Sequence, residues 1–397
     1  TRSLSSAASD VYKRQHQIAE RHLQNFTDNI VHKYAAYRNF DYGQDEKNVV
    51  SGLSPAINRR IICEWEVVKN VLNSHSFKKV EKFIQEICWR TYWKGYLEHY
   101  PHIWVNYLSD VKYMKDLKKG QAYIEAVDGR TGIDCFDHWI KDLERDGYLH
   151  NHTRMWFASI WIHTLRLPWQ LGADIFLKQL VDGDPASNTL SWRWVAGLHT
   201  KGKSYLAYPD NIKKFTNGKF YPNKQLATHV KSAEEEYKPL PKQLNFDSKI
   251  RSGKKGFLVH ESDLSPNFLN EYDMVLIQGS PLKSIKRSSL VQSFISDALK
   301  EYQKECTENQ KCDVALINLE DTKMIKRLMD EKGLSSLSSY YPALGAVNDQ
   351  IQKLRNEGII VDYQYQKWDR SFWPHSSKGF FKLKSKIPKI LEQLNCM

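Results

Sequence analysis

Hydrophobic residues recur at helical spacing through the first half of the chain. The clearest face is made of Val80, Phe83, Ile84, Ile87 and Cys88. These positions are three or four residues apart, as on the buried side of a helix. Similar segments run over residues 156–167 and 173–181, and β-branched runs are scarce. We therefore expect residues 16–221 to form an all-α domain.

Beyond residue 255 the pattern changes to short apolar runs that alternate with helical segments. The runs are GFLVH, DMVLIQG, DVALINL and GIIVDY, and helical patterns lie at 290–304, 322–332 and 348–357. This alternation predicts a small α/β domain over 256–397 with a mostly parallel sheet. Residues 222–255 are rich in Lys, Glu, Ser and Pro, which is typical of a linker. The expected fold class is an all-α domain followed by an α/β domain.

Composition limits the classes of partner and compartment. The formal net charge of +12 favours a polyanionic partner such as nucleic acid. The six cysteines show neither CxxC nor zinc spacing, so we expect no metal site and a reducing, cytoplasmic location. No apolar run reaches the eighteen residues of a membrane helix, so we expect no membrane partner. Residues 1–15, TRSLSSAASDVYKRQ, resemble a translated sequencing adapter, and we expect this leader to lie outside the native fold.

Three clusters concentrate polar and aromatic residues. In VDGDPASNTLSWRW, Asp184 and Pro185 are a typical helix start, which places Asn188 and Trp192 on one face and turns Trp194 away. The alternative is a capped helix whose tryptophans are core residues. In FIQEICWRTYWKGY one helical stripe carries an acid, an arginine and aromatic rings, at Glu86, Trp89, Arg90 and Trp93. The alternative is an ion pair beside rim aromatics.

The third cluster is GYLHNHTRM, which holds His150, Asn151, His152 and Arg154. Two histidines without a nearby carboxylate or cysteine at ligand spacing do not make a metal site. A hydrogen-bonding pocket is expected instead. Asp182 is the candidate acid for Arg154, since a partly buried arginine needs a partner.

Several motifs occur in register along residues 131–194, within a resemblance to a known family that covers roughly residues 34–194. They are TGIDCFDHWIKDL, GYLHNHTRM, LPWQLGADIFLKQL and DGDPASNTLSWRW. In sequence and order they resemble the flavin-binding domain of the DNA photolyase and cryptochrome family. The α/β antenna domain that usually precedes this domain is not expected here, and an α/β segment follows instead. The resemblance specifies no antenna pigment.

The resemblance implies FAD as the cofactor, held by a set of polar residues. The implied FAD contacts are Tyr34, Ser51, Ser54, Arg90, Asn151, Arg154, Asp182, Asp184 and Asn188. Val50 stands where the family usually has threonine. Asn188 would face the flavin N5, and an amide at that position resembles photolyases. A neutral amide can bond a reduced, anionic flavin without charge repulsion.

The resemblance also implies an electron relay and a lesion pocket. Trp192 and Trp169 match the two inner relay positions, and Tyr113 or Tyr123 could replace the third tryptophan. The residues that match contacts to a cyclobutane dimer are Glu86, Trp89, Met155 and Trp194. The histidines that (6-4) photolyases carry are absent from positions 151 and 155, which favours cyclobutane dimers.

Three functions remain open. The first is a deoxyribodipyrimidine photo-lyase, a monomer that repairs UV-damaged DNA with light. The second is a cryptochrome-like blue-light receptor that binds FAD without repair. The third is a nucleic-acid-binding module with a relic flavin pocket. The basic aromatic terminus, SFWPHSSKGFFKLKSKIPKIL, could bind DNA or pack on the helical domain.

Overall fold

A computed structural model describes residues 15–43, 48–199, 204–230, 239–248, 251–265, 270–309 and 311–397. The expected leader lies outside these residues, except that Gln15 begins a helix. The described chain forms two compact units. In the described part of the chain, unit 1 holds Asn29–Ser51 and Tyr100–Leu240, and unit 2 holds residues 15–28, Gly52–His99 and Pro241–Met397. Among the described residues, no helix is long and apolar enough to cross a membrane.

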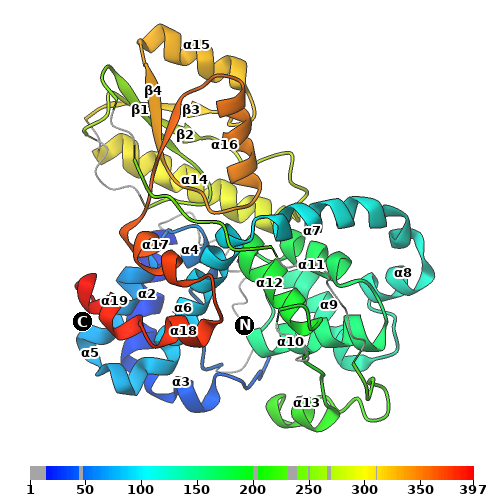
Figure 1. Ribbon diagram of the computed structural model, residues 1–397. Coiled ribbons are helices and arrows are strands. Elements are labelled where there is room, and N and C mark those ends of the chain that lie inside the picture. Colours follow the sequence, from blue (N-terminus) through cyan, green and yellow to red (C-terminus); the bar gives the residue numbers. More distant parts are fainter. Residues whose placement is uncertain are drawn as a thin grey trace. The chain divides into compact units, whose positions relative to one another are not determined.

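Unit 1 is helical in its described part (Figure 1). Its helices are α3 (Val31–Tyr37), α7 (His102–Tyr113), η1 (Met114–Lys119), α8 (Gln121–Val127), α9 (Asp134–Asp146), α10 (Asn151–Ser159), η2 (Ile160–Thr164), α11 (Trp169–Gln179), α12 (Pro185–Val195) and α13 (Pro209–Phe215). The segment expected to be helical over 156–167 is an α-helix only to Ser159, and η2 continues it as a π-helical turn. The helix α12 packs on α7, α10 and α11. The motif DGDPASNTLSWRW therefore lies beside the motif GYLHNHTRM.

Unit 2 combines N-terminal helices with a five-stranded sheet and C-terminal helices. Its elements are α2 (Gln15–Asn29), α4 (Ser54–Asn58), α5 (Glu64–Ser74), α6 (Phe77–His99), β1 (Lys255–Val259), β2 (Met274–Gln278), α14 (Ser289–Asn309), β3 (Asp313–Ile317), α15 (Thr322–Lys332), β4 (Ser336–Tyr340), α16 (Ala346–Asn356), β5 (Val361–Gln364), α17 (Lys367–Phe372), η3 (Trp373–His375), α18 (Phe380–Lys384) and α19 (Ile387–Gln393).

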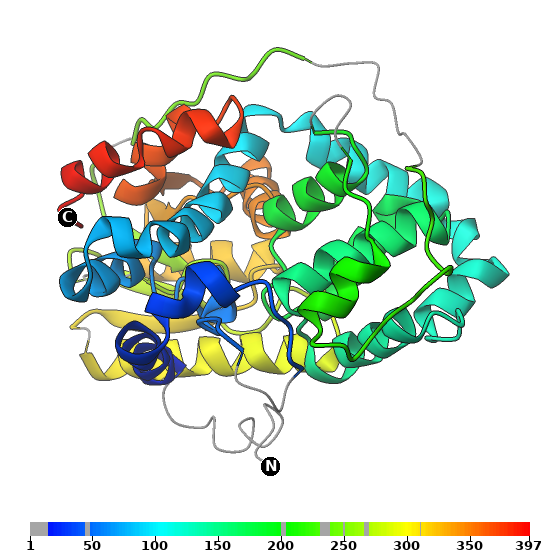
Figure 2. The same ribbon diagram turned by 90° about the horizontal axis from the view of Figure 1, so that it is seen from below.

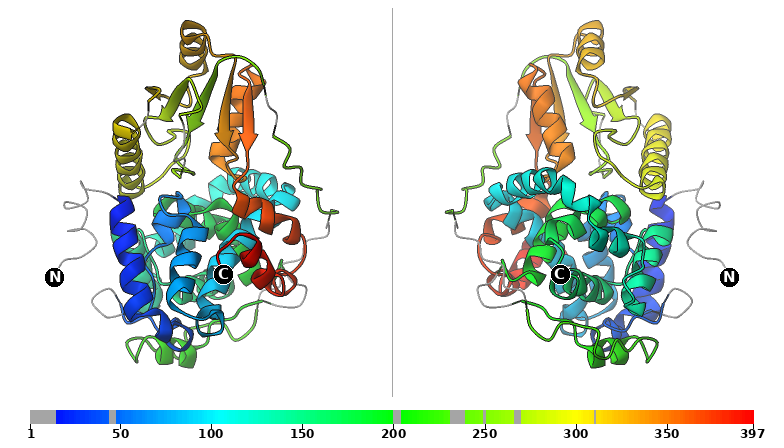
Figure 3. Two further views of the ribbon diagram at one scale, coloured as in Figure 1. Left: turned by 90° about the vertical axis from the view of Figure 1, so that its left-hand side faces the viewer. Right: turned by 90° about the vertical axis from the view of Figure 1, so that its right-hand side faces the viewer.

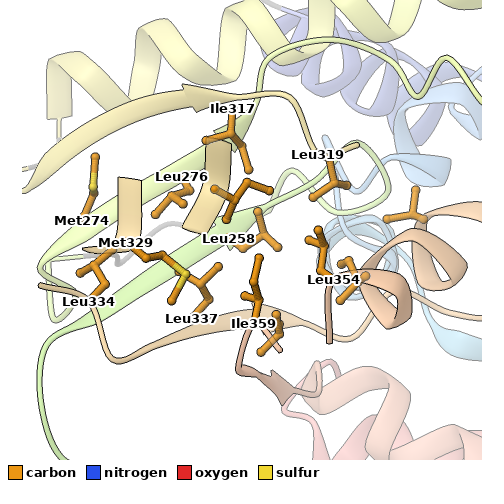
Figure 4. Packing of buried hydrophobic residues seen from close by; sticks show 14 of the residues in the cluster. Leu258, Met274, Leu276, Ile317, Leu319, Met329, Leu334, Leu337, Leu354 and Ile359 are labelled. Carbon is orange, nitrogen blue, oxygen red and sulfur yellow. The ribbon is translucent and has the colours of Figure 1, made fainter. Parts of the chain in front are cut away.

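The sheet is parallel throughout, with the strand order β3-β2-β1-β4-β5. Because successive side chains of a strand point to opposite faces, Leu258 and Leu276 lie on one face and Phe257 and Val275 on the other. The helices α15 and α16 pack on the first face, where Leu258, Leu276 and Leu337 belong to one buried cluster (Figure 4). The helix α14 covers the opposite face, as both views of Figure 3 show. This confirms the α/β pattern predicted from the sequence, with β4 as an additional strand.

A buried arginine explains why residues 52–99 group with the C-terminal part of the chain. Arg60, two residues after the end of α4, lies 3.1 Å from Asp263 and 2.7 Å from Asp369. It also pairs with Glu64 at 3.3 Å. Although burial opposes its charge, the three carboxylates raise the pKa of Arg60 above its ordinary value. An unpaired charge is costly to bury, so this network ties the segment between α4 and α5 to Asp263, which follows β1, and to Asp369 on α17.

The C-terminal residues form helices that pack on α6 (Figure 2). The rings of Trp368, Phe372, Trp373 and Phe380 are buried there. Trp368 Nε1 donates to Thr91 Oγ1 on α6 at 2.8 Å. The aromatic terminus therefore packs inside unit 2, which is one of the two alternatives that its composition left open.

The two units divide the chain differently from the domains expected at 16–221, 222–255 and 256–397. The helices α2 and α4 to α6 belong to unit 2, together with the sheet. The reason is contact across long sequence separations, such as Arg60 with Asp369, which no local pattern reveals. The extent of the FAD-binding domain stays a prediction.

Candidate functional site

The first turn of α12 presents two of the expected cofactor residues. Asp184 is the N-cap, and its side chain accepts a hydrogen bond from Ser187 N at 2.7 Å. Asn188 Nδ2 donates to the carbonyl of Ala173 at 2.8 Å. Both Asp184 and Asn188 are buried. The helix start predicted from the sequence is confirmed, and its bonds fix two polar side chains at this end of α12.

An ion pair from α10 adjoins this turn. Arg154 Nη2 lies 3.0 Å from Asp182 Oδ2, which confirms the partner expected from the sequence. Arg154 Nε donates to the carbonyl of Leu149 at 2.8 Å, so the guanidinium is held in one orientation. Asp182 is buried, and Arg154 is only partly so. Arg154 is thus paired with Asp182, which lies two residues before the N-cap Asp184. We call Arg154, Asp182, Asp184 and Asn188 the polar cluster.

The two histidines of GYLHNHTRM have structural roles. His150 is the N-cap of α10 and accepts from His152 N at 3.2 Å. The ring of His152 stacks on Trp156, with centroids 4.4 Å apart. Burial lowers the pKa of His150 and lowers that of His152 to about 4. Both rings are therefore neutral near pH 7 and order the start of α10 for Asn151 and Arg154.

Aromatic rings connect the expected relay residues to other parts of unit 1. Trp192 is buried and meets Trp161 edge to face at 6.4 Å. Trp161 meets Tyr123 at 5.8 Å. This chain of rings reaches Tyr123, one of the two tyrosines named as substitutes, whereas Tyr113 is 84% exposed.

A second series of rings starts from Trp169. Its indole stacks on Tyr107 with centroids 5.8 Å apart, and Tyr107 lies 5.4 Å from Trp104. Trp161, Tyr107 and Trp104 are not among the relay residues expected from the sequence. The signal that could have found Trp161 is its position in the tryptophan-rich helix that follows GYLHNHTRM.

Unit 2 holds the expected stripe on α6. Glu86 pairs with Lys82 one turn earlier at 2.8 Å. Arg90 donates to Asn58 Oδ1 on α4. The ring of Trp89 stacks on Phe380 of α18, with centroids 3.7 Å apart and planes 12° from parallel. Trp93 is buried, so only part of the predicted stripe is accessible.

The remaining expected residues lie on both units. Tyr34 on α3, Ser51 before α4, and Met155 on α10 are partly buried members of unit 1. Ser54, the first residue of α4, belongs to unit 2. Trp194 is partly buried and stacks on Tyr205, with centroids 5.6 Å apart. The roles of these residues toward cofactor and lesion stay predictions.

Comparison with known proteins identifies the helical part of the chain. Residues 83–227 match the family described as the FAD binding domain of DNA photolyase. This similarity covers less than half of the chain. FAD is the cofactor that the description of the matching family names. The polar cluster fits such a group, since an arginine donor suits flavin carbonyls, while carboxylates and the amide oxygen of Asn188 suit N–H and hydroxyl groups.

The curated relatives share only part of their length with this chain. A deoxyribodipyrimidine photo-lyase of Neurospora crassa is 26% identical over 254 residues, which are 61% of this chain and 38% of that protein. One from Agrobacterium fabrum is 31% identical over 182 residues, 44% of this chain and 36% of the relative. The chain thus spans less than two fifths of the length of these relatives.

Solved structures of a photolyase and a cryptochrome align with this chain at low scores. A class III photolyase from Agrobacterium tumefaciens is 27% identical, with a TM-score of 0.44 over 53% of this chain and 44% of that one. A cryptochrome from Synechocystis is 21% identical, with a TM-score of 0.44 over 51% of this chain and 43% of that one.

Proposed function

We propose that the protein repairs cyclobutane pyrimidine dimers in DNA by a light-driven reaction. The observation that carries this proposal is the polar cluster of Arg154, Asp182, Asp184 and Asn188 within the matched domain. Its members are buried or partly buried and hydrogen-bonded, as residues that orient a bound cofactor should be. The photo-lyase names of the relatives support the same reaction.

Each member of the cluster has a distinct part in holding the cofactor. When bound, reduced FAD supplies the light-excited electron that opens the cyclobutane ring. The amide nitrogen of Asn188 donates to the carbonyl of Ala173, which fixes the orientation of the amide. The amide oxygen can then accept a hydrogen bond from an N–H of a reduced flavin. Arg154 contributes positive charge, and its pair with Asp182 restrains its position. The buried aromatic rings around Trp192 exclude water from this side.

We assign the lesion contacts to Glu86, Trp89, Met155 and Trp194. Indole rings stack on pyrimidines, a thioether packs on them, and a carboxyl group bonds base edges. Glu86→Gln should lower the repair yield and leave FAD content unchanged, because the amide lacks the charge and proton exchange of the acid. Glu81→Gln, on the same helix, is the matched control. An unchanged yield in Glu86→Gln would remove this role.

The decisive test is repair of a thymine-dimer oligonucleotide by FAD-loaded, reduced protein. Illuminated and dark samples are compared by chromatography. We expect restored thymines only in the light. No restoration by fully loaded and fully reduced protein would refute the proposal.

A cryptochrome-like receptor is the second candidate, and the Trp89–Phe380 stack favours it. Phe380 covers one face of the indole that should contact the lesion. A receptor would bind FAD but show equal affinity for damaged and undamaged strands. Binding in the dark to matched oligonucleotides with and without a thymine dimer separates the two, since a repair enzyme prefers the damaged strand.

A further inference from the structure

A pocket of about 580 Å³ opens in unit 1. It lies between residues 204–211 and 228–230. Tyr205 and Tyr208 line it together with Asn211, His229 and Val230. Its volume falls in the range of pockets that bind small organic ligands. Neither the expected cofactor residues nor the expected lesion residues line it.

Tyr205 connects this pocket to the candidate lesion site. Its ring stacks on Trp194 at 27° between planes, and Tyr205 also lines the pocket. Tyr208, just before α13, is 61% exposed. A planar group in the pocket would therefore contact Tyr205, and Tyr205 in turn contacts Trp194.

The polar groups of the pocket suit the edge of a nucleobase. Asn211 Oδ1 accepts from the buried Trp156 Nε1 at 2.9 Å, which orients the amide and leaves its nitrogen as a donor. Burial raises the pKa of Tyr205 to about 12, so its hydroxyl stays neutral and can donate or accept. Thr228 and His229 add a hydroxyl and an imidazole, which bond each other at 2.8 Å. Rings of this kind stack on nucleobases, and the donors and acceptors can bond the base edges, so the pocket suits a nucleobase better than an apolar ligand.

Positive charge lies on the helix that carries Asn211. Lys213 and Lys214 of α13 are exposed, and Lys219 follows in the next turn. Lys213 Nζ sits 4.7 Å from the ring centre of Tyr221. Asp210 is the acid on the same helix, so the local balance is positive. A ligand with a phosphate attached to its ring is therefore favoured over a neutral one.

We infer that this pocket takes an unpaired nucleobase that flanks the lesion, while lysines of α13 contact its phosphate. The inference rests on the proposed function, because it assumes that damaged DNA is the substrate. It adds a second base contact, which would fix the strand relative to the lesion pocket.

The test uses the FAD-loaded full chain in the dark. A series of thymine-dimer oligonucleotides carries one abasic site, moved through the three positions on each side of the dimer. We expect one position at which loss of the base weakens binding about tenfold, the scale of one stacked base. In Tyr208→Ala this position should lose its effect, whereas Tyr208→Phe should keep it. Tyr37→Ala, at an exposed tyrosine of α3 outside the pocket lining, is the matched control.

The outcomes separate the inference from the proposed function. If dimer-containing strands bind better than undamaged ones but no flanking abasic site matters, the inference is wrong and the proposed function stands. If Tyr208→Ala keeps the full abasic effect with unchanged FAD content, another surface reads the base and the inference is also wrong. If wild-type protein shows no preference for the dimer, the proposed function fails.

Discussion

Glu98 should make the stability of unit 2 depend on pH near neutrality. It lies near the end of α6, is 6% exposed, and accepts hydrogen bonds from Tyr341 Oη at 2.9 Å and Leu344 N at 2.8 Å. Burial is the largest influence and raises the pKa of Glu98 from 4.5 to about 7, although both bonds oppose the rise. The folded protein therefore binds a proton here that the unfolded chain has already released.

The sign and size of the effect follow from the two pKa values. Stability from the protonated form is fully present below pH 4.5 and is lost as the pH rises through about 7. A shift of this size corresponds to about 3 kcal/mol of unfolding free energy. Glu98→Gln keeps an acceptor oxygen and carries no charge. Between pH 4.5 and 8, the unfolding free energy of the wild type should therefore fall by about 3 kcal/mol relative to that of Glu98→Gln.

Urea unfolding at half-unit pH steps, with wild type and Glu98→Gln in parallel, measures this difference. The two proteins share all other titratable groups, so the contribution of those groups to the pH dependence cancels in the difference between their unfolding free energies. Glu331→Gln, at an exposed position of α15, is the control and should show no such trend. A wild-type minus Glu98→Gln difference that is constant across the pH range would refute the reasoning.

Three further predictions concern unit 1. Gly172→Ala should destabilise the protein by about 1–3 kcal/mol and change tryptophan emission, because its Cβ would lie 2.3 Å from the ring of Trp192; unchanged melting and emission would contradict the packing. Asp184→Ala should lower the unfolding free energy by about 1 kcal/mol through loss of the helix cap and should reduce FAD content, measured by denaturation and flavin absorbance, whereas Asp184→Asn should keep most of the stability. Trp161→Phe should slow flavin photoreduction several-fold, followed by absorbance under blue light, if electrons leave through Tyr123; an unchanged rate would exclude that route.

The local sequence predicted helix α12 and the side chains that it presents, because helix caps and side-chain spacing act over only a few residues. The pair Asp184–Pro185 caps and starts α12 wherever the helix packs, and the spacing of Asn188 and Trp192 then fixes their common face. Continuous apolar runs such as MVLIQ are typical of strands covered on both faces, so the parallel sheet was also predictable. The order of the motifs indicated the resemblance to the flavin-binding domain of photolyases.

Tertiary structure decided what local patterns could not. The strand β4 has the sequence SLSSY, which lacks the apolar run of its neighbours, and it is a strand because it fits between β1 and β5. Its buried Ser339 satisfies its hydroxyl by donating to the carbonyl of Leu258. Phe380 reaches Trp89 across 291 residues, and Arg60 finds Asp369 across 309. Short-range periodicity and capping are encoded within a few residues, whereas partners for buried rings and charges exist only once distant segments pack together.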